Sequence, residues 1–316
     1  EKALWDDHLN RWYPACIDFA YGGYLSNLSH DFKPMEKQDK MIVSQARHLW
    51  TTSVIAKKFH NEVYKGYARH GMDFLKKMWD STYGGFYQDV DRSSRPLHSD
   101  DKKTAYGNAF AIYGLSAYYE VSGDSTALQL AKETFRWLEK YSHDSLYNGY
   151  FQDLARDGKI LQRNDSTPDH ITIGYKDYNS SIHLLEAFTD LYKIWPDTLV
   201  RKRLSEMYDL VKDTMINDRH FLEMYFEPNW KHVTFYGQDS ATIRKHFSMD
   251  HVSFGHDIET AYLLLEAAHA LGIPDHPALR DELRLIVDQS LKGFDTSNGG
   301  LYDEGYYFDR SKDITI

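Results

Sequence analysis

A short glycine–aromatic motif recurs along this chain of 316 residues, and it limits the fold more than any other feature. The motif reads Gly-Gly-Tyr at 22–24, Gly-Gly-Phe at 84–86, Asn-Gly-Tyr at 148–150 and Gly-Gly-Leu at 299–301. The first three copies stand roughly sixty residues apart, and a degenerate copy over 221–230 divides the longer last interval. Each copy lies between two helical apolar patterns, so the predicted repeating unit is a helix, a glycine–aromatic turn and a second helix.

Apolar residues at helical spacing predict about nine helices between these turns. The helices cover 4–19, 39–60, 62–79, 102–120, 125–141, 179–195, 199–216, 256–271 and 277–294. Segment 104–119 is apolar on nearly every side, whereas 125–140 carries a charged stripe, so buried inner helices should alternate with outer ones. Such hairpins form either an open solenoid or a toroid of six hairpins. Polar residues near the starts of the inner helices favour the toroid, so the predicted fold is all-α, an (α/α)6 barrel.

The chain is expected to form a single domain over 1–316, because no Pro-, Gly- or Ser-rich linker divides it. A toroid of six hairpins has twelve helices, so we expect roughly three further helices beyond Ile316. The glycine–aromatic turns should lie at the rim and pair tightly, as short strands do. Two connections, 142–176 and 218–253, exceed ordinary loop lengths, and long loops usually shape a site or contact a partner.

The charge and cysteine content exclude several classes of function. The net charge is −10 and Lys and Arg form no run, which excludes nucleic acid and anionic membranes as expected partners. No apolar stretch approaches the roughly 18 residues of a membrane helix. The single cysteine, Cys16, allows no internal disulfide and favours a reducing compartment, so we expect a cytoplasmic protein, although a secreted protein without disulfides would have the same pattern. The expected oligomeric state is a monomer or homodimer. Because the chain begins at Glu1, a targeting peptide could still have been removed.

The segment SFGHDIE at 253–259 carries the strongest chemical signal. It places His256 and Glu259 one helical turn apart at the start of a strongly apolar helix, where Gly255 is expected to begin the helix. The positive end of the helix dipole disfavours an imidazolium, so His256 is predicted to be neutral and available as a base near pH 7. The alternative is a hydrogen-bonded pair of His256 and Glu259 with only a structural role.

Two more polar residues stand where inner helices should be apolar. Arg47 lies in a helix that otherwise has a buried pattern, and its alternative role is to reach the rim or to pair with a carboxylate. His183 lies in the first turns of a helix that Asn179 or Ser180 is expected to cap. Its alternative role is that of a capped histidine in the core.

Tyr106 and Asn108 could also face inward, although an aromatic core position and a buried amide bonded to the backbone are the better interpretations. The other histidines, such as His143, are expected at the surface. No Cys, His or Asp pattern has zinc spacing, so we expect no metal. Nucleotide-binding, phosphate-loop and serine-hydrolase motifs are absent from the sequence, so we expect no cofactor either.

Four segments in this order resemble the N-acylglucosamine 2-epimerase superfamily, and most closely its cellobiose/mannobiose 2-epimerase branch. They are SQARHLW at 44–50, AYGNAFAIYGLSAYY at 105–119, NSSIHLLEAF at 179–188 and SFGHDIETAYLLLEAA at 253–268. Members of the superfamily fold as (α/α)6 barrels, which agrees with the hairpins inferred from periodicity. The resemblance therefore implies an enzyme that epimerises an aldose at carbon 2.

The resemblance also implies a role for each matching residue. Arg47 would bind the carbonyl or enediolate oxygen of the sugar, and His183 would assist at carbons 1 and 2. His256 would be one of two catalytic bases, with Glu259 as its associated carboxylate. Asn179 matches an asparagine that contacts the sugar. Tyr106, Asn108 and Trp50 are further candidates for substrate contact, named without a match in the family pattern.

Two features of the sequence depart from the family pattern. The family's Trp-Trp segment and its second catalytic histidine lie near the C-terminus, beyond Ile316. Asn108 and Ser181 occupy positions that are often histidine in the epimerase branch, which bears on the preferred substrate.

Inversion at carbon 2 needs ring opening, removal of the carbon-2 proton and its return to the opposite face, so two positioned acid/base groups are expected. An aldose–ketose isomerase, which moves a proton along one face, and an N-acylglucosamine 2-epimerase are the near alternatives. A glycoside hydrolase on the same barrel is more distant, because Asp250, Asp257 and Glu259 crowd into one segment instead of facing each other. A non-catalytic sugar-binding protein is the third class.

Overall fold

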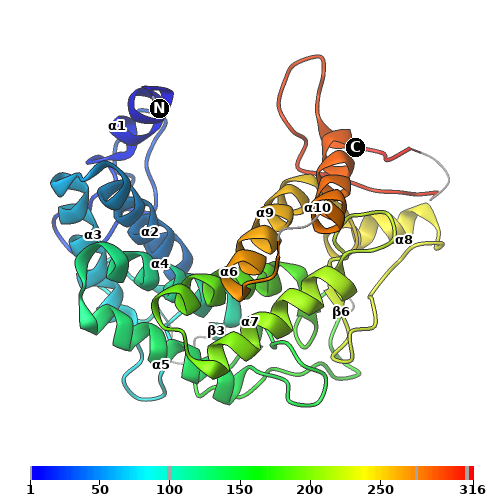
Figure 1. Ribbon diagram of the computed structural model, residues 1–316, viewed down its shortest axis with the longest axis horizontal. Helices are drawn as coiled ribbons and strands as arrows, with labels where there is room; N and C mark the ends of the chain where they lie inside the picture. The colour runs from blue at the N-terminus through cyan, green and yellow to red at the C-terminus, as the bar shows by residue number, and fades with distance from the viewer. Residues whose placement is uncertain (1, 98–101, 169, 275–276, 310–312) are drawn as a thin grey trace. The chain divides into compact units, whose positions relative to one another are not determined.

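The computed structural model describes residues 2–97, 102–168, 170–274, 277–309 and 313–316 (Figure 1). The chain packs as two compact units. Unit 1 contains residues 1–141 and 154–159, and unit 2 contains residues 142–153 and 160–316. None of the helices in the described ranges combines the length and the apolar character needed to cross a bilayer. The expectation of a single domain stays a prediction.

Unit 1 is built from two helical hairpins. Its inner helices, α2 and α4, pack against each other, while α3 packs on α2 and α5 packs on α4 (Figure 1). Strand β1 pairs antiparallel with β2, and Lys40 lies opposite Val90. The elements are the π-helix η1 (Leu4–Leu9), α1 (Asn10–Trp12), β1 (Lys40–Met41), α2 (Ile42–Phe59), α3 (Glu62–Leu75), η2 (Lys76–Met78), β2 (Asp89–Val90), β3 (Lys103–Thr104), α4 (Ala105–Ser122) and α5 (Ser125–Tyr141).

Unit 2 repeats this plan with α6 and α9 as inner helices. Helix α6 packs against both α7 and α9, and α10 packs on α9. Strands β5 and β6 pair antiparallel, as do β7 and β8. The elements are β5 (Lys176–Asp177), α6 (Tyr178–Ile194), α7 (Thr198–Leu210), η3 (Val211–Met215), β6 (Tyr225–Phe226), α8 (Ser240–Lys245), η4 (Phe247–Met249), β7 (Val252–Ser253), α9 (Phe254–Leu271), α10 (Pro277–Ser290), η5 (Leu291–Gly293) and β8 (Glu304–Gly305). Strand β4 (Asp153–Leu154) spans the boundary between the units.

Eight of the nine predicted helices form, and most of their ends lie within a few residues of the prediction. The prediction over 4–19 is wrong beyond residue 12, where the chain turns. Pro14 is the reason, because it disfavours helical geometry at the preceding residue, and Tyr13 is extended at φ −112° and ψ 125°. The short helix α8, inside the second long connection, was not predicted.

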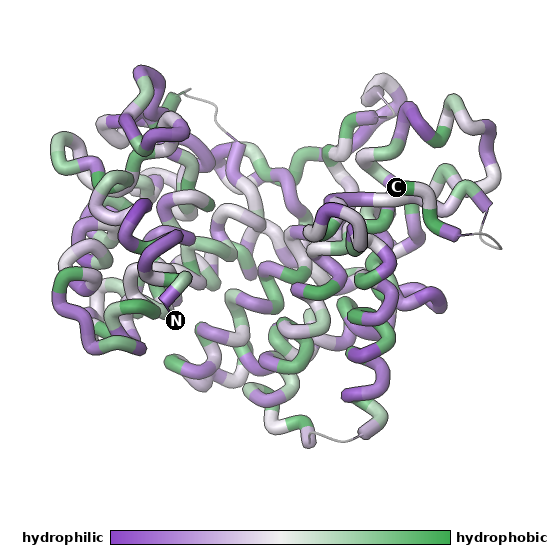
Figure 2. The backbone as a smooth tube through the Cα atoms, turned by 90° about the horizontal axis from the view of Figure 1, so that it is seen from above, coloured by the Kyte–Doolittle hydropathy of each residue, from purple (hydrophilic) through white to green (hydrophobic). Residues whose placement is uncertain are grey.

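The expected alternation of inner and outer helices is confirmed by burial. Most residues of α4 are buried, whereas α5 buries one apolar face and exposes its charged residues. Figure 2 shows hydrophobic and hydrophilic residues interspersed along the helical segments of the backbone. Gly114 of α4 permits a close approach to α2, because a Cβ there would lie 2.7 Å from the carbonyl oxygen of Ala46.

The strand-like pairing of the glycine–aromatic turns is also confirmed, including that of the degenerate copy. One isolated bridge closes each turn: Ile17 with Tyr24, Trp79 with Phe86, His143 with Tyr150, Ile216 with Leu222, and Phe294 with Leu301. Each turn has a residue at positive φ one or two positions before the bridge, and glycine supplies it in four of them. In the degenerate copy His220 adopts this left-handed conformation at φ 64°, so the repeat persists without its glycine.

The fourth residue of three inner helices ties the helix to the turn before it. The side-chain oxygens of Gln45, Asn108 and Asp257 accept backbone N–H groups of Tyr24, Phe86 and Leu222, at 2.9, 2.9 and 3.0 Å. The amide nitrogen of Asn108 donates to the carbonyl of Thr104, and Asn108 is 1% exposed. Both polar ends of Asn108 are therefore engaged within the protein. The structure thus favours the buried amide, the alternative to sugar contact, for this residue.

Three fully buried lysines, which the sequence analysis did not single out, begin β1, β3 and β5. The Nζ atoms of Lys40, Lys103 and Lys176 lie 2.9, 2.9 and 2.8 Å from the carboxylates of Asp18, Asp80 and Asp144 in the glycine–aromatic turns. In the degenerate copy Val252 takes the place of the lysine, and Asn217 that of the aspartate. Both charges are thus replaced together, as expected if neither is tolerated alone when buried.

Candidate active site

The first turn of α9 holds His256 by two hydroxyl groups. Its Nδ1 lies 2.7 Å from Oγ of Ser253 and 3.0 Å from the hydroxyl of Tyr178, which begins α6. Ser253 occupies the N-cap position of α9 but makes no side-chain capping bond, because its hydroxyl is turned to the imidazole. When Nδ1 donates its proton to Ser253, Nε2 is the ring nitrogen whose lone pair can accept a proton.

The phenol of Tyr178 is a stable partner for this ring. Burial raises the pKa of Tyr178, so the hydroxyl keeps its proton at physiological pH. The ring of Tyr178 also meets that of His256 edge to face, with centroids 5.1 Å apart. The imidazole is therefore fixed both by hydrogen bonds and by packing.

Glu259 does not form the expected pair with His256. Its side chain is partly buried, and it makes no hydrogen bond or ion pair with any described residue. The structural pairing proposed as the alternative is therefore wrong, because the hydroxyls of Ser253 and Tyr178 take Nδ1 instead. The helix begins at Phe254, one residue earlier than predicted from Gly255.

The opening turns of α6 carry His183 and Asn179. His183 is 4% exposed, and its Nδ1 lies 2.8 Å from Oε2 of Glu186 one turn later. The cap of α6 is Asp177, not Asn179 or Ser180 as predicted, because its Oδ1 accepts the N–H of Ser180 at 2.7 Å. Asn179 is thereby left with a buried Oδ1 that has no partner within the described ranges, as expected of a group that binds a ligand.

The capping carboxylate gives a testable pH dependence. Burial raises the pKa of Asp177 to about 6, although hydrogen bonds from Ser180 oppose the shift. In the unfolded chain the pKa is about 3.9, so the folded state holds this proton more tightly and stability falls as pH rises from about 4 to about 6. Asp177→Asn keeps a capping side chain and should be more stable than wild type by up to ~3 kcal/mol at pH 7, with no gain at pH 4. Urea unfolding at both pH values measures this, and an equal gain at both would contradict it.

Unit 1 presents Arg47 and Trp50 from one face of α2. Arg47 is exposed, not buried as its helix pattern suggested, and its guanidinium lies 5.1 Å from the ring centroid of Phe110. It forms no hydrogen bond or ion pair with a described residue, so the alternative of a carboxylate partner has no support in the described part of the chain. Trp50 stacks on Tyr113 with centroids 5.1 Å apart and planes 15° apart. Partly exposed aromatic faces beside a free guanidinium suit a sugar and an oxyanion.

A cavity of about 390 Å³ borders this face of unit 1, lined by Leu4, His8, Leu9, Trp12, Tyr13, Ser44, Arg47, His48 and Thr51. Burial lowers the pKa of His48 to about 4, so its ring is neutral at physiological pH. Tyr106 is partly exposed and packs edge to face on Phe110, with centroids 5.0 Å apart. Its role as a sugar contact stays a prediction.

Sequence reasoning missed three residues that complete these groups: Ser253, Tyr178 and Glu186. Two of them were detectable, since Ser253 stands three residues before His256 and Glu186 three residues after His183. The surface position expected for His143 is wrong, because its side chain is 6% exposed and lies 2.9 Å from Glu206.

Comparison with known proteins identifies the family. Residues 23–315 match the N-acylglucosamine 2-epimerase (GlcNAc 2-epimerase) family. The chain belongs to this family. It is a carbohydrate epimerase.

Three relatives show how far the likeness extends. A cellobiose 2-epimerase of Bacteroides fragilis is 30% identical over 308 residues, which cover 96% of this chain and 74% of that protein. The solved structure of a cellobiose 2-epimerase from Bacillus thermoamylovorans has a TM-score of 0.84 at 26% identity, covering 99% of this chain and 76% of the other. A D-mannose isomerase of Marinomonas mediterranea is 23% identical over 308 residues, 95% of this chain and 73% of that protein. The predicted (α/α)6 fold is confirmed by these similarities.

Proposed function

We propose that this epimerase inverts carbon 2 of the reducing-end aldose of a β-linked disaccharide such as cellobiose. The observation that carries the proposal is the imidazole of His256, whose orientation is fixed through Nδ1 by Ser253 and Tyr178, which makes Nε2 the nitrogen that can act as the base. The names of the more similar relatives support the disaccharide, and the orphan oxygen of Asn179 supports a sugar hydroxyl as ligand.

The reaction begins with the open-chain aldose. Nε2 of His256 takes the carbon-2 proton, the C–H electron pair forms the C1=C2 bond, and the carbonyl oxygen becomes the oxyanion of an enediolate. Arg47 stabilises that oxyanion, and His183, oriented by Glu186, assists proton transfer at carbons 1 and 2. Return of a proton to the opposite face of carbon 2 re-forms the aldehyde with inverted configuration. His256 supplies one of the two acid/base groups that inversion needs.

Aldose–ketose isomerisation is the nearest alternative, and an N-acyl sugar is the alternative substrate. Likeness to a D-mannose isomerase supports the isomerase, although at lower identity than the epimerases. Glycoside hydrolysis is disfavoured, because two of the three candidate carboxylates are already bonded. Asp257 accepts the N–H of Leu222, and Asp250 accepts Thr234 and Phe235.

Product analysis separates these functions. Incubation of the full-length protein with cellobiose, followed by chromatography, should yield the disaccharide with mannose at its reducing end. A ketose product would assign the isomerase, and release of free glucose would assign the hydrolase. N-acetylglucosamine and free mannose, assayed in parallel, test the substrate class, and turnover of either in preference to cellobiose would overturn the disaccharide proposal.

Arg47→Ala is expected to lower kcat by roughly 10²- to 10³-fold, because it removes a donor from the developing oxyanion. Arg47 is exposed and not hydrogen-bonded to described residues, so far-UV circular dichroism should be unchanged. Arg47→Lys keeps the charge but loses the planar fork, so it should recover only part of the rate. Lys57→Ala, on the same helix α2, is the matched control and should keep the wild-type rate. Loss of helix content in Arg47→Ala would instead assign a structural role.

The location and the oligomeric state are separate proposals. Cys16 is a buried free thiol, which suits a reducing compartment such as the cytoplasm. A monomer or homodimer stays a prediction.

A further inference from the structure

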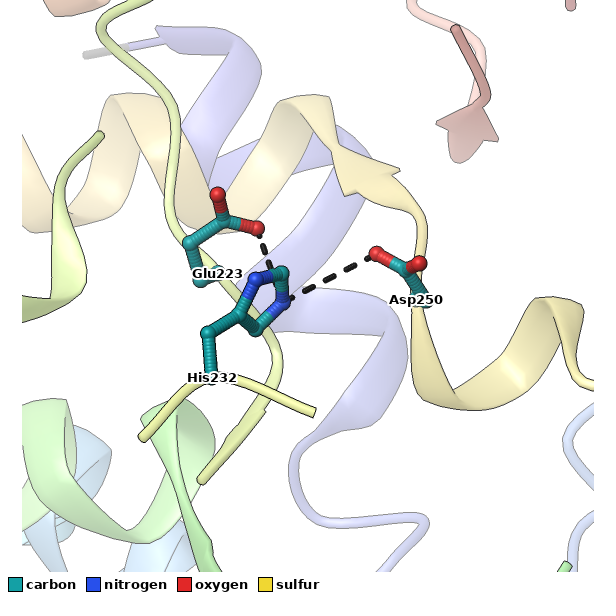
Figure 3. A group of neighbouring side chains, drawn as sticks. All are labelled: Glu223, His232 and Asp250. Carbon is teal, nitrogen blue, oxygen red and sulfur yellow. Dashed lines mark ion pairs between the residues drawn. The ribbon is translucent and has the colours of Figure 1, made fainter. Parts of the chain in front are cut away.

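The long connection between α7 and α9 closes on itself around three side chains that can bind a metal. Glu223, His232 and Asp250 come from its beginning, middle and end, and Figure 3 shows the imidazole between the two carboxylates. Nε2 of His232 lies 2.9 Å from Oε2 of Glu223 and 3.8 Å from Oδ1 of Asp250. One donor atom from each residue lies within 4.8 Å of the other two.

These separations suit a small divalent cation of the zinc class. Donors at roughly 2.0–2.1 Å from a tetrahedral zinc ion lie roughly 3.3 Å apart, between the two distances measured from His232. An imidazole nitrogen with two carboxylate oxygens suits zinc and its neighbours better than calcium or magnesium, which prefer oxygen alone. A cavity of about 20 Å³ borders Glu223 and Asp250, which is enough for a water molecule as the fourth ligand.

Hydrogen bonds hold one oxygen of each carboxylate, and the other oxygen of each is the one nearer the imidazole. Nδ2 of Asn217 donates to Oε1 of Glu223 at 2.8 Å. The hydroxyl of Thr234 and the N–H of Phe235 donate to Oδ2 of Asp250 at 2.8 and 2.7 Å. Outer contacts of this kind orient ligands and usually accompany a metal site.

The imidazole nitrogen in the middle of the cluster lacks a hydrogen bond. Nε2 of His232 is buried and has no hydrogen-bond partner in the described part of the chain, although Oε2 of Glu223 is only 2.9 Å away. The two atoms meet the distance of an ion pair without the alignment of a hydrogen bond. Buried polar atoms normally have a partner, and an ion between the three side chains would provide it.

The other copies of the repeat show that the scaffold does not require this cluster. The backbone N–H of Glu223 donates across its turn to the carbonyl of Met215. The residues that make the same bond in the first three copies are apolar or aromatic: Leu25, Tyr87 and Phe151. His232 forms an isolated bridge with Phe226, and the residue that makes the corresponding bridge is a proline in two of these copies, Pro34 and Pro96. This fourth copy is also the one in which Val252 replaces the buried lysine. The three side chains that could bind a cation therefore occur in the copy that lacks the buried lysine of the first three copies.

We propose that Glu223, His232 and Asp250 bind one zinc-class divalent cation, which ties the connection to the start of α9. Asp250 precedes Ser253 by three residues, and Ser253 holds the ring of His256. The ion is thus a positioning element for the catalytic base and does not itself touch the sugar. This site stands independently of the substrate assigned to the enzyme.

Calorimetric titration of the EDTA-treated full-length protein with ZnCl2 tests the proposal. Wild type should bind one equivalent of zinc. Each of the three variants His232→Gln, Glu223→Gln and Asp250→Asn should bind no zinc or bind it at least tenfold more weakly. His143→Gln is the matched control, since it breaks a histidine–carboxylate pair of the same unit at 2.9 Å that has no second carboxylate. It should keep the wild-type stoichiometry. Zinc should also raise the Tm of wild type and of the control, but not of the three ligand variants.

Three separate ligand variants keep the test decisive if one of them fails to fold. Absence of saturable zinc binding by wild type would overturn the proposal. Equal stoichiometry and affinity in wild type and all three ligand variants would do so as well, because the ion would then be bound elsewhere.

Discussion

His256→Ala is expected to remove nearly all epimerisation activity, with a fall in kcat of about 10²- to 10⁴-fold, because a positioned general base is removed. Sugar binding should change little, since the ring is held by Ser253 and Tyr178 and does not belong to the aromatic face of unit 1. The fold should also persist, because the freed hydroxyl of Ser253 can cap α9 as serine normally does. Steady-state kinetics and sugar-binding calorimetry measure the two effects separately.

His269→Ala provides the matched control for this variant. His269 is exposed in the last turn of the same helix, so its loss should leave kcat unchanged. The kcat of Ser253→Ala should lie between those of His256→Ala and His269→Ala, because the base remains but one of its two hydroxyl contacts is lost. Full activity of His256→Ala would contradict the assignment of the base.

Lys176→Met is expected to lower the free energy of unfolding by about 3–5 kcal/mol, because it strands the buried carboxylate of Asp144 without its cation. Burial alone would raise the pKa of Asp144, but the hydrogen bond from Lys176 lowers it, and the pKa lies below its ordinary value. Nζ of Lys176 also donates to the carbonyls of Asn148 and Pro228, at 2.7 Å each. Equilibrium urea unfolding measures the loss.

Two further variants distinguish the loss of a charge partner from the loss of packing. Lys40→Met should lower the free energy of unfolding by less, because Asp18 keeps its bidentate contact with Arg92. The double variant Asp144→Asn/Lys176→Val recreates the natural pair Asn217 and Val252 of the degenerate turn, so it should recover most of the lost stability. A double variant no more stable than Lys176→Met would contradict the pairwise account.

Periodicity was enough to predict most of the helices and the turns between them. A helix with one buried face repeats its apolar residues every turn, and a turn at positive φ favours glycine, so both are readable from local sequence. The prediction failed where a local rule was overlooked, as at Pro14, or where a helix was as short as α8. The buried lysines also left a signal, since each stands two residues before an inner helix.

The candidate site could be predicted only as a set of residues, not as a set of contacts. The spacing of His256 and Glu259 suggested a pair, yet the ring bonds to Tyr178, which lies 78 residues away. Asn108 had the same polar character as a sugar ligand, and only its bonds to Phe86 and Thr104 show that its amide is engaged. Contacts of this range depend on how helices pack, which residue spacing does not encode.

Proton–deuterium exchange at carbon 2 of cellobiose, followed by NMR in deuterated water, tests the central claim most directly. The account predicts that the full-length protein places deuterium at carbon 2 as the epimer forms, and that His256→Ala places none. Exchange that persists in His256→Ala, or glucose release without exchange in wild type, would contradict it.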